Sequence, residues 1–139
     1  MAGLLTHFGA GLLGALIIFF IFYKSEKKTK LIYGVFFIFA NILPDFIDFG
    51  ILSVKMGSLN PDEIMTHKLF HTLAVLGHTF SNWIIVGLVI IVIIMIFSFL
   101  KKISWKGFMK WVVGVILVLI GIRIHLLLDV LIQESSHWI

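Results

Sequence analysis

The chain has 139 residues, of which 60% are hydrophobic and 13% are charged. This apolar fraction lies far above the soluble norm, so we expect a single integral membrane domain over residues 1–139. The absence of cysteine excludes disulfides, thiolate metal sites and cysteine nucleophiles. The formal net charge of +4 reflects lysines beside apolar runs, so no nucleic-acid partner is expected.

Four apolar runs are long enough to cross a bilayer, and we expect each to form a transmembrane helix. They cover residues 4–23, a run from Leu31 that Pro44 interrupts, 82–100 and 111–132. Pro44 follows about 13 apolar residues, or roughly 20 Å of helix, which is shorter than the hydrocarbon core. Because proline frees a carbonyl of the preceding turn and bends the chain, the second helix is predicted to kink within the membrane.

Most of the cations fall in two loops, residues 24–30 and 101–110. The connection 55–66 is mixed in sign, and the tail after Ile132 carries Glu134 and no lysine or arginine. The positive-inside rule then predicts that both loops are cytoplasmic and both termini extracytoplasmic, in a multi-pass protein of the cell (inner) membrane.

A further helix start is predicted at residues 60–63, whose sequence Asn-Pro-Asp-Glu offers a cap, a first-position proline and first-turn acids. A helix from there to Leu100 would be about 60 Å long, too long for one crossing. We therefore expect a break near residues 77–82, preceded by a short helix that is interfacial or re-entrant on the outer side.

Polar side chains of metal-ligand type lie within or beside the apolar runs. They are His7, Asn41, Asp45, Asp48, His71, His125 and Asp129. The predicted topology brings all of them near the outer face, whereas a random scatter would have left some near the lysine loops. Because an ionised group at the membrane centre costs roughly 2.5–3.5 kcal/mol, such residues mark function by default. Their common depth predicts a divalent-metal site in the outer leaflet.

His125 and Asp129 are spaced i,i+4, so they share one helical face and can hold one ion, or the carboxylate can orient the imidazole. The alternative is a neutral buried histidine hydrogen-bonded to an acid. Asn41, Asp45 and Asp48 form a second stripe, whose carboxylates can bind one or two ions or supply a general base.

Arg123 is the one arginine of the chain and could instead pair with an acid of that stripe, or hold a phosphate. It lies about 160° from His125 on a helical wheel, so it is not expected to share the ligand face.

Three histidines precede the third span, and His67, His71 and His78 fall within about 40° of one another on an ideal wheel. We rank His71 first because it is deeper than His67, and we leave His78 as an even choice. The alternative is an interfacial helix with titratable histidines. His7 has the weakest local support and gains weight from its matching depth.

Four sequence blocks occur in a defined order. They are Thr6-His7-Phe8-Gly9, Asn41-Ile42-Leu43-Pro44-Asp45-Phe46-Ile47-Asp48, His67-Lys68-Leu69-Phe70-His71-Thr72 and His125-Leu126-Leu127-Leu128-Asp129. This order resembles the YdjM-type inner-membrane metal-dependent hydrolases, which are grouped with zinc-dependent phospholipases C and single-strand nucleases. The resemblance implies a helical zinc site whose ligands are His7, Asp45, His71, His125 and Asp129, with His67 and Asp48 as further candidates nearby.

We therefore expect an all-α membrane protein that binds a divalent metal, with zinc as the expected ion. The expected activity is hydrolysis of a phosphoester of a lipid or amphiphile at the outer leaflet, with Asp45 or Asp48 as general base. One alternative is metal or proton transport, although the inner halves of the spans are nearly all apolar. A second alternative is a non-catalytic membrane subunit with a structural metal site.

Overall fold

The computed structural model describes residues 3–132, and Glu134 of the tail lies outside them. Every regular element within residues 3–132 is a helix, which confirms the all-α prediction. Three helices are long and apolar enough to cross a membrane unbroken: α1 (Leu4–Ile21), α7 (Phe80–Phe99) and α8 (Trp105–Leu131). A bent helix pair that starts with α2 (Lys27–Ala40) brings the number of candidate spans to four when it is counted as one.

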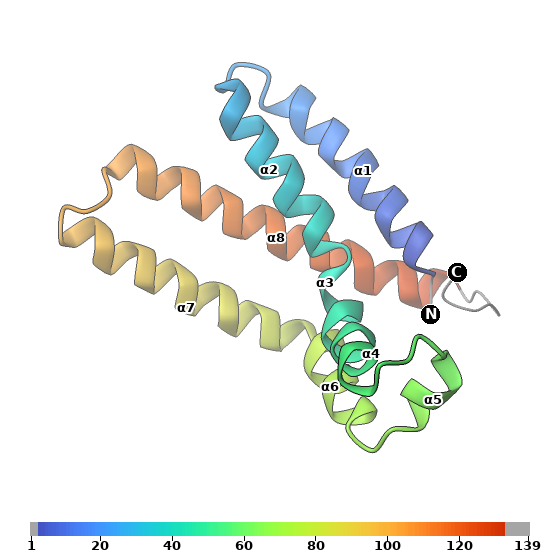
Figure 1. The fold of residues 1–139 in the computed structure, drawn as a ribbon. Coiled ribbons are helices and arrows are strands. Elements are labelled where there is room, and N and C mark those ends of the chain that lie inside the picture. The colour runs from blue at the N-terminus through green and yellow to red at the C-terminus, as the bar shows by residue number, and fades with distance from the viewer. Residues whose placement is uncertain (1–2, 133–139) are drawn as a thin grey trace.

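The spans form two antiparallel hairpins, α1 with α2 and α7 with α8, and α8 contacts both helices of the first hairpin (Figure 1). Helix α1 packs along α2, α7 packs along α8, and α2 in turn lies across α8. The N-terminal end of α1 and the C-terminal end of α8 meet at the same end of the molecule, opposite the α1–α2 turn (Figure 1). Residues near the two ends of the chain are therefore neighbours in space.

The two lysine loops lie at one end of the bundle, as the predicted alternation requires. The Nζ atom of Lys110 lies 3.3 Å from the Oε2 atom of Glu26, which joins the two loops through an ion pair. The Tyr33 hydroxyl donates a hydrogen bond of 2.8 Å to the Lys110 carbonyl. We call this end, with residues 24–30 and 101–110, the lysine end.

Glycine permits the closest approach between α2 and α8. A Cβ atom at Gly121 would lie 2.8 Å from the Cβ of Ala40 and 3.2 Å from the Phe37 carbonyl oxygen. A larger side chain would therefore push the helices apart. Because Gly121 stands one turn before His125, its contact holds the end of α2 against the ligand-bearing turn of α8.

The second span is broken where the sequence predicts a kink. Helix α2 ends at Ala40, and the chain continues through α3 (Leu43–Asp45), the π-helix η1 (Phe46–Gly50) and α4 (Ile51–Met56). The second part of the span is bent by 51° away from the direction of α2. Pro44 at the start of α3 cannot continue the hydrogen-bonding pattern of α2, which accounts for the break.

Two short helices, α5 (Pro61–Thr66) and α6 (Phe70–His78), precede α7 and pack against the far half of the bent span. The Oδ1 atom of Asn60 accepts the Asp62 N–H at 3.1 Å, as the predicted cap requires. Thr79 is extended, with φ −94° and ψ 107°, so the expected break before the third span is confirmed. A second break, at His67, was not predicted.

Single-cysteine labelling tests the sidedness of this arrangement, because the chain has no native cysteine. Lys102→Cys and Leu59→Cys both replace exposed residues, one at the lysine end and one in the α4–α5 connection. In intact cells, a membrane-impermeant maleimide is expected to label only the Leu59→Cys variant, and both variants after permeabilisation. Labelling of Lys102→Cys in intact cells would invert the topology.

Candidate metal centre

The break in the second span exposes a backbone carbonyl that orients the imidazole of His125. At the break, the backbone carbonyl of Asn41 lies 2.8 Å from the Nδ1 atom of His125. A carbonyl oxygen can only accept, so Nδ1 carries the proton and the lone pair resides on Nε2. A histidine whose second nitrogen is held in this way is the usual arrangement for a metal ligand.

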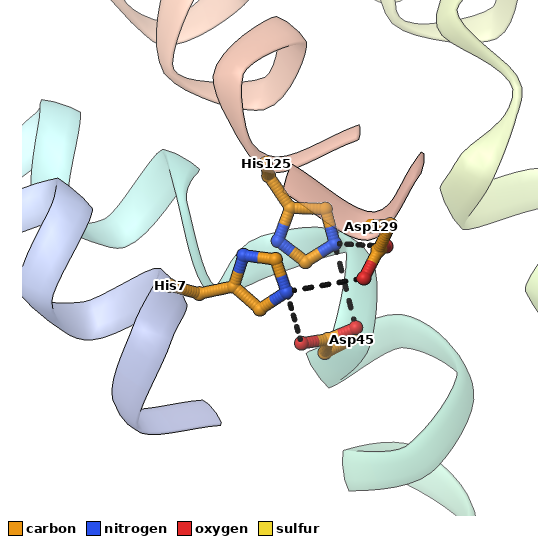
Figure 2. Close-up of side chains that lie close together, drawn as sticks. All are labelled: His7, Asp45, His125 and Asp129. Atoms are coloured by element: carbon orange, nitrogen blue, oxygen red, sulfur yellow. Dashed lines mark hydrogen bonds and ion pairs between the residues drawn. The ribbon is translucent and has the colours of Figure 1, made fainter. Parts of the chain in front are cut away.

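Four side chains from three separate parts of the chain converge at the end opposite the lysine end. They are His7 from α1, Asp45 from α3, and His125 and Asp129 from α8. One ligand atom from each can be chosen so that all four lie within 4.8 Å of one another. Figure 2 shows the two imidazoles and the two carboxylates pointing toward a common centre. We call these four residues the metal centre.

The distances within the metal centre suit shared coordination better than direct hydrogen bonding. His125 Nε2 lies 3.2 Å from Asp129 Oδ2 and 3.4 Å from Asp45 Oδ1. His7 Nε2 lies 3.3 Å from Asp129 Oδ1 and 3.8 Å from Asp45 Oδ2. Charge-assisted hydrogen bonds would be about 2.7–2.9 Å long. Ligand atoms around a tetrahedral zinc ion, with bonds of about 2.0–2.2 Å, are spaced by about 3.4 Å.

Burial makes these groups costly without a cation. His7 and His125 are fully buried, and Asp45 is 3% exposed. Within residues 3–132, the buried Oδ2 atom of Asp45 has no hydrogen-bond partner. An unsatisfied buried acceptor costs about 1–3 kcal/mol, and more when it is charged. The residues present therefore fit a divalent cation, which would satisfy this oxygen.

The structure brings His78, and not His71, to the metal centre. His78 ends α6, and its Nε2 atom lies 3.3 Å from Asp129 Oδ2 and 3.5 Å from Asp45 Oδ1. Its Nδ1 atom faces Asp48 Oδ2 at 3.4 Å, while Asp48 Oδ1 accepts the Phe49 N–H at 2.6 Å. Asp48 therefore contacts His78 and is not one of the four residues of the metal centre.

His71, which was ranked first, and His67, which the family resemblance added as a candidate, lie outside the metal centre, so their prediction as ligands is wrong in this structure. The wheel that aligned them assumes one continuous helix, but His67 is extended, with φ −69° and ψ 131°, and α6 begins only at Phe70. The Nδ1 atom of His67 accepts the Leu69 N–H at 3.2 Å. His71 is exposed beside the Phe70 ring. The glycine that precedes His78 is the sequence signal that could have singled it out.

Gly77 explains why His78 can reach the metal centre. A Cβ atom at Gly77 would lie 2.8 Å from the Pro44 carbonyl oxygen, so α6 touches the backbone of the broken span. The Trp83 Nε1–H donates to the Gly77 carbonyl at 2.6 Å and fixes this end of α6 against α7. The close approach brings His78 alongside Asp45.

Arg123 lies away from the metal centre, as its position on the helical wheel relative to His125 predicts. Its guanidinium sits over the Phe80 ring, 5.2 Å from the ring centroid, and the residue is exposed. Among the residues that the structure describes, it forms no ion pair with Asp45 or Asp48. The alternative in which Arg123 neutralises the second stripe is therefore not realised.

Comparison of the chain with protein-family models, with curated proteins and with solved structures found no match.

Removal of a ligand should release the metal. His125→Ala and Asp129→Asn are each expected to lower the metal content of the purified protein by at least about tenfold, because each leaves an incomplete set of ligands. Arg123→Gln, two residues from His125 on the exposed face, is the matched control and should keep its metal. The measurement is metal per chain by mass spectrometry, and stoichiometric metal in both ligand variants would reject this site.

Proposed function

We propose that this protein is a metal-dependent hydrolase embedded in the cell (inner) membrane, acting on a phosphoester of a lipid or amphiphile. The observation that carries the proposal is the buried metal centre, which combines two imidazoles with two carboxylates. Zinc suits such a mixed nitrogen and oxygen set. When bound, a divalent ion lowers the pKa of a coordinated water toward neutrality and polarises a phosphoryl oxygen. The resemblance of the four sequence blocks to YdjM-type hydrolases motivates the choice of reaction.

The two acids considered for the general base have different surroundings. Asp45 belongs to the metal centre, so its oxygens would be occupied as metal ligands. Asp48 is buried beside it, and the Phe49 N–H holds its Oδ1 atom at 2.6 Å. Asp48 is therefore the carboxylate that remains to take up a proton from the attacking water.

An apolar cleft lined by residues of the second span, α7 and α8 supports an amphiphilic substrate. The cleft has a volume of about 320 Å³ and is lined by Phe36, Leu43, Trp83, Val86, Gly87, Ile90, Trp111, Gly114, Val115, Val118, Leu119 and Ile122. Leu43 stands two residues before Asp45, and Ile122 stands one turn before His125. A phosphoester bound at the metal centre could thus extend an acyl chain along the cleft toward the lysine end.

The interior between the metal centre and the lysine end speaks against a conduction pathway through one chain. Ile18, Tyr33 and Phe37 form a buried cluster there, packed against partly buried side chains that include Leu117 and Ile124. An ion crossing this layer would lose its hydration and meet one polar group in the cluster, the Tyr33 hydroxyl, which already donates to the Lys110 carbonyl. Metal uptake into proteoliposomes that depends on the metal centre would favour transport instead.

Hydrolysis by the purified protein is the direct test. With a fluorogenic phosphodiester lipid in mixed micelles, wild-type turnover should disappear on chelation and return with Zn²⁺. His7→Ala is expected to reduce kcat/KM by at least about 100-fold, since it removes one ligand, whereas Arg123→Gln should stay within about twofold. Metal-loaded protein that turns over no phosphoester would refute the proposed reaction.

Chain-length dependence tests the cleft separately. Val118→Phe should fill the cleft and raise KM for a long-chain substrate, while a short-chain analogue of the same phosphoester should be unaffected. Ile116→Phe, a similar change at a residue that is 47% exposed and does not line the cleft, is the control. Equal effects of the two variants on both substrates would show that the cleft does not hold the chain.

A further inference from the structure

We propose that the metal centre holds two divalent cations, with His78 as an additional ligand and with Asp45 and Asp129 bridging the two ions. This inference rests on the proposed function and deepens it, because it assigns separate ligands to each ion. Four observations support it: the division of the carboxylate oxygens, the positions of the imidazole rings, the partners of the second ring nitrogens and the balance of charge.

The first observation is that each carboxylate directs its two oxygens to opposite sides. Asp45 Oδ2 and Asp129 Oδ1 face His7, at 3.8 and 3.3 Å from its Nε2 atom. Asp45 Oδ1 and Asp129 Oδ2 face His125, at 3.4 and 3.2 Å. A single ion would not require both oxygens of both acids, whereas two ions bridged by carboxylates would use all four.

The second observation is the spacing of the imidazole rings. The rings of His7 and His125 are stacked, with centroids 3.7 Å apart and planes 25° apart. Two imidazoles that point at one tetrahedral ion, with bonds of about 2.0–2.1 Å, have centroids about 5 Å apart. Stacked rings instead direct their lone pairs side by side, toward ions separated by about the stacking distance. Two-metal sites have a separation of about 3.5–4 Å.

His78 completes the shell on the His125 side. The centroids of the His78 and His125 rings are 5.4 Å apart, and their Nε2 atoms are 3.5 Å apart, as expected for two imidazoles on one ion. His78 Nε2 also lies 3.3 Å from Asp129 Oδ2 and 3.5 Å from Asp45 Oδ1. The first ion thus has four protein ligands, which makes a closed shell.

The second ion has His7 and the two remaining carboxylate oxygens. Three protein ligands leave a tetrahedral position open, which is the pattern of catalytic zinc rather than structural zinc. We therefore assign the coordinated water and the substrate phosphoryl group to the ion at His7, and a structural and charge-balancing role to the ion between His78 and His125. In this two-ion arrangement Asp48, whose Oδ2 atom faces His78, does not serve as the general base that the one-ion proposal assigns to it.

The third observation concerns the second nitrogens of the closed shell. His125 Nδ1 donates to the Asn41 carbonyl at 2.8 Å, and His78 Nδ1 faces Asp48 Oδ2 at 3.4 Å. The hydrogen bond of His125 directs its Nε2 lone pair toward Asp45 and Asp129, whereas His78 Nδ1 contacts Asp48 without a hydrogen-bond partner among the described residues. His78 therefore presents its Nε2 atom to Asp45 and Asp129, and Asp48 lies beside its other ring nitrogen.

The fourth observation is charge. Asp45, Asp48 and Asp129 contribute −3 when ionised, and ligating imidazoles are neutral. One divalent cation leaves −1 in a buried site, whereas two give +1. The positive balance favours an anionic phosphoester more than the negative balance left by a single ion does.

Metal stoichiometry and spin coupling test the second ion on the full-length protein. Metal-free protein in detergent is titrated with ZnCl₂ and washed, and bound metal is measured by mass spectrometry. Two ions per chain are expected for wild type and for His71→Ala, the matched control on the exposed face of α6. His78→Ala should bind one of the two ions at least about tenfold more weakly, so that only one survives the wash. The same protein loaded with Mn²⁺ should show an exchange-coupled electron paramagnetic resonance spectrum, which His78→Ala converts into that of isolated Mn²⁺.

The outcomes separate this inference from the proposed function. One ion in wild type, with chelator-sensitive hydrolysis, would overturn the second ion and leave the hydrolase proposal standing. Metal-free wild type would overturn both. Two ions retained in folded His78→Ala would reject His78 as a ligand. If that variant does not fold, the Mn²⁺ spectrum of wild type decides, because an uncoupled signal at saturation contradicts a bridged pair.

Discussion

The arrangement of the surrounding helices depends on two acids inside an apolar bundle, Asp45 and Asp129. A buried carboxylate is tolerated only where cationic or hydrogen-bonding groups surround it, so each neighbouring element has to deliver such a group. Helix α1 contributes His7, and the end of α6 contributes His78. The irregular features of the fold, including the bent span, the π-helix and the break at Thr79, are concentrated around this meeting point. Local departures from regular structure of this kind are characteristic of functional sites.

The break after α2 has two consequences that depend on each other. It turns the chain so that Asp45 enters the bundle, and it leaves the Asn41 carbonyl to accept the Nδ1–H of His125. Neither would occur in a straight helix, because Asn41 would then bond within its own helix. The small residue at Gly121 allows α8 to come close enough for the hydrogen bond to form. Pro44 and Gly121 thus help to set the geometry of the candidate ligands, Pro44 by breaking the helix and Gly121 by allowing close packing.

The layout also relates the candidate chemistry to the membrane. Polar ligands lie at one end, an apolar layer around Phe37 separates them from the lysine end, and an apolar cleft runs beside them. This combination is the one that the proposed activity on an amphiphile requires. The exposed arginine over Phe80 plays no part in the metal centre. Within residues 3–132, the candidate metal ligands therefore gather at the end where α1, the bent span, α6 and α8 meet.

The sequence by itself determined the properties that depend on composition and local geometry. Hydrophobic length predicted the spans, Pro44 predicted the bend, and the i,i+4 spacing predicted that His125 and Asp129 share a face, because bilayer thickness and helical repeat act without tertiary partners. Only the tertiary structure decided which histidine completes the site. Depth in the sequence favoured His71 among three histidines that the helical wheel aligned. The chain leaves the helix at His67, and His78 reaches Asp45 because Gly77 lets α6 touch a carbonyl from a distant segment. Contacts of this kind are set by the packing of several elements at once, which no local pattern encodes.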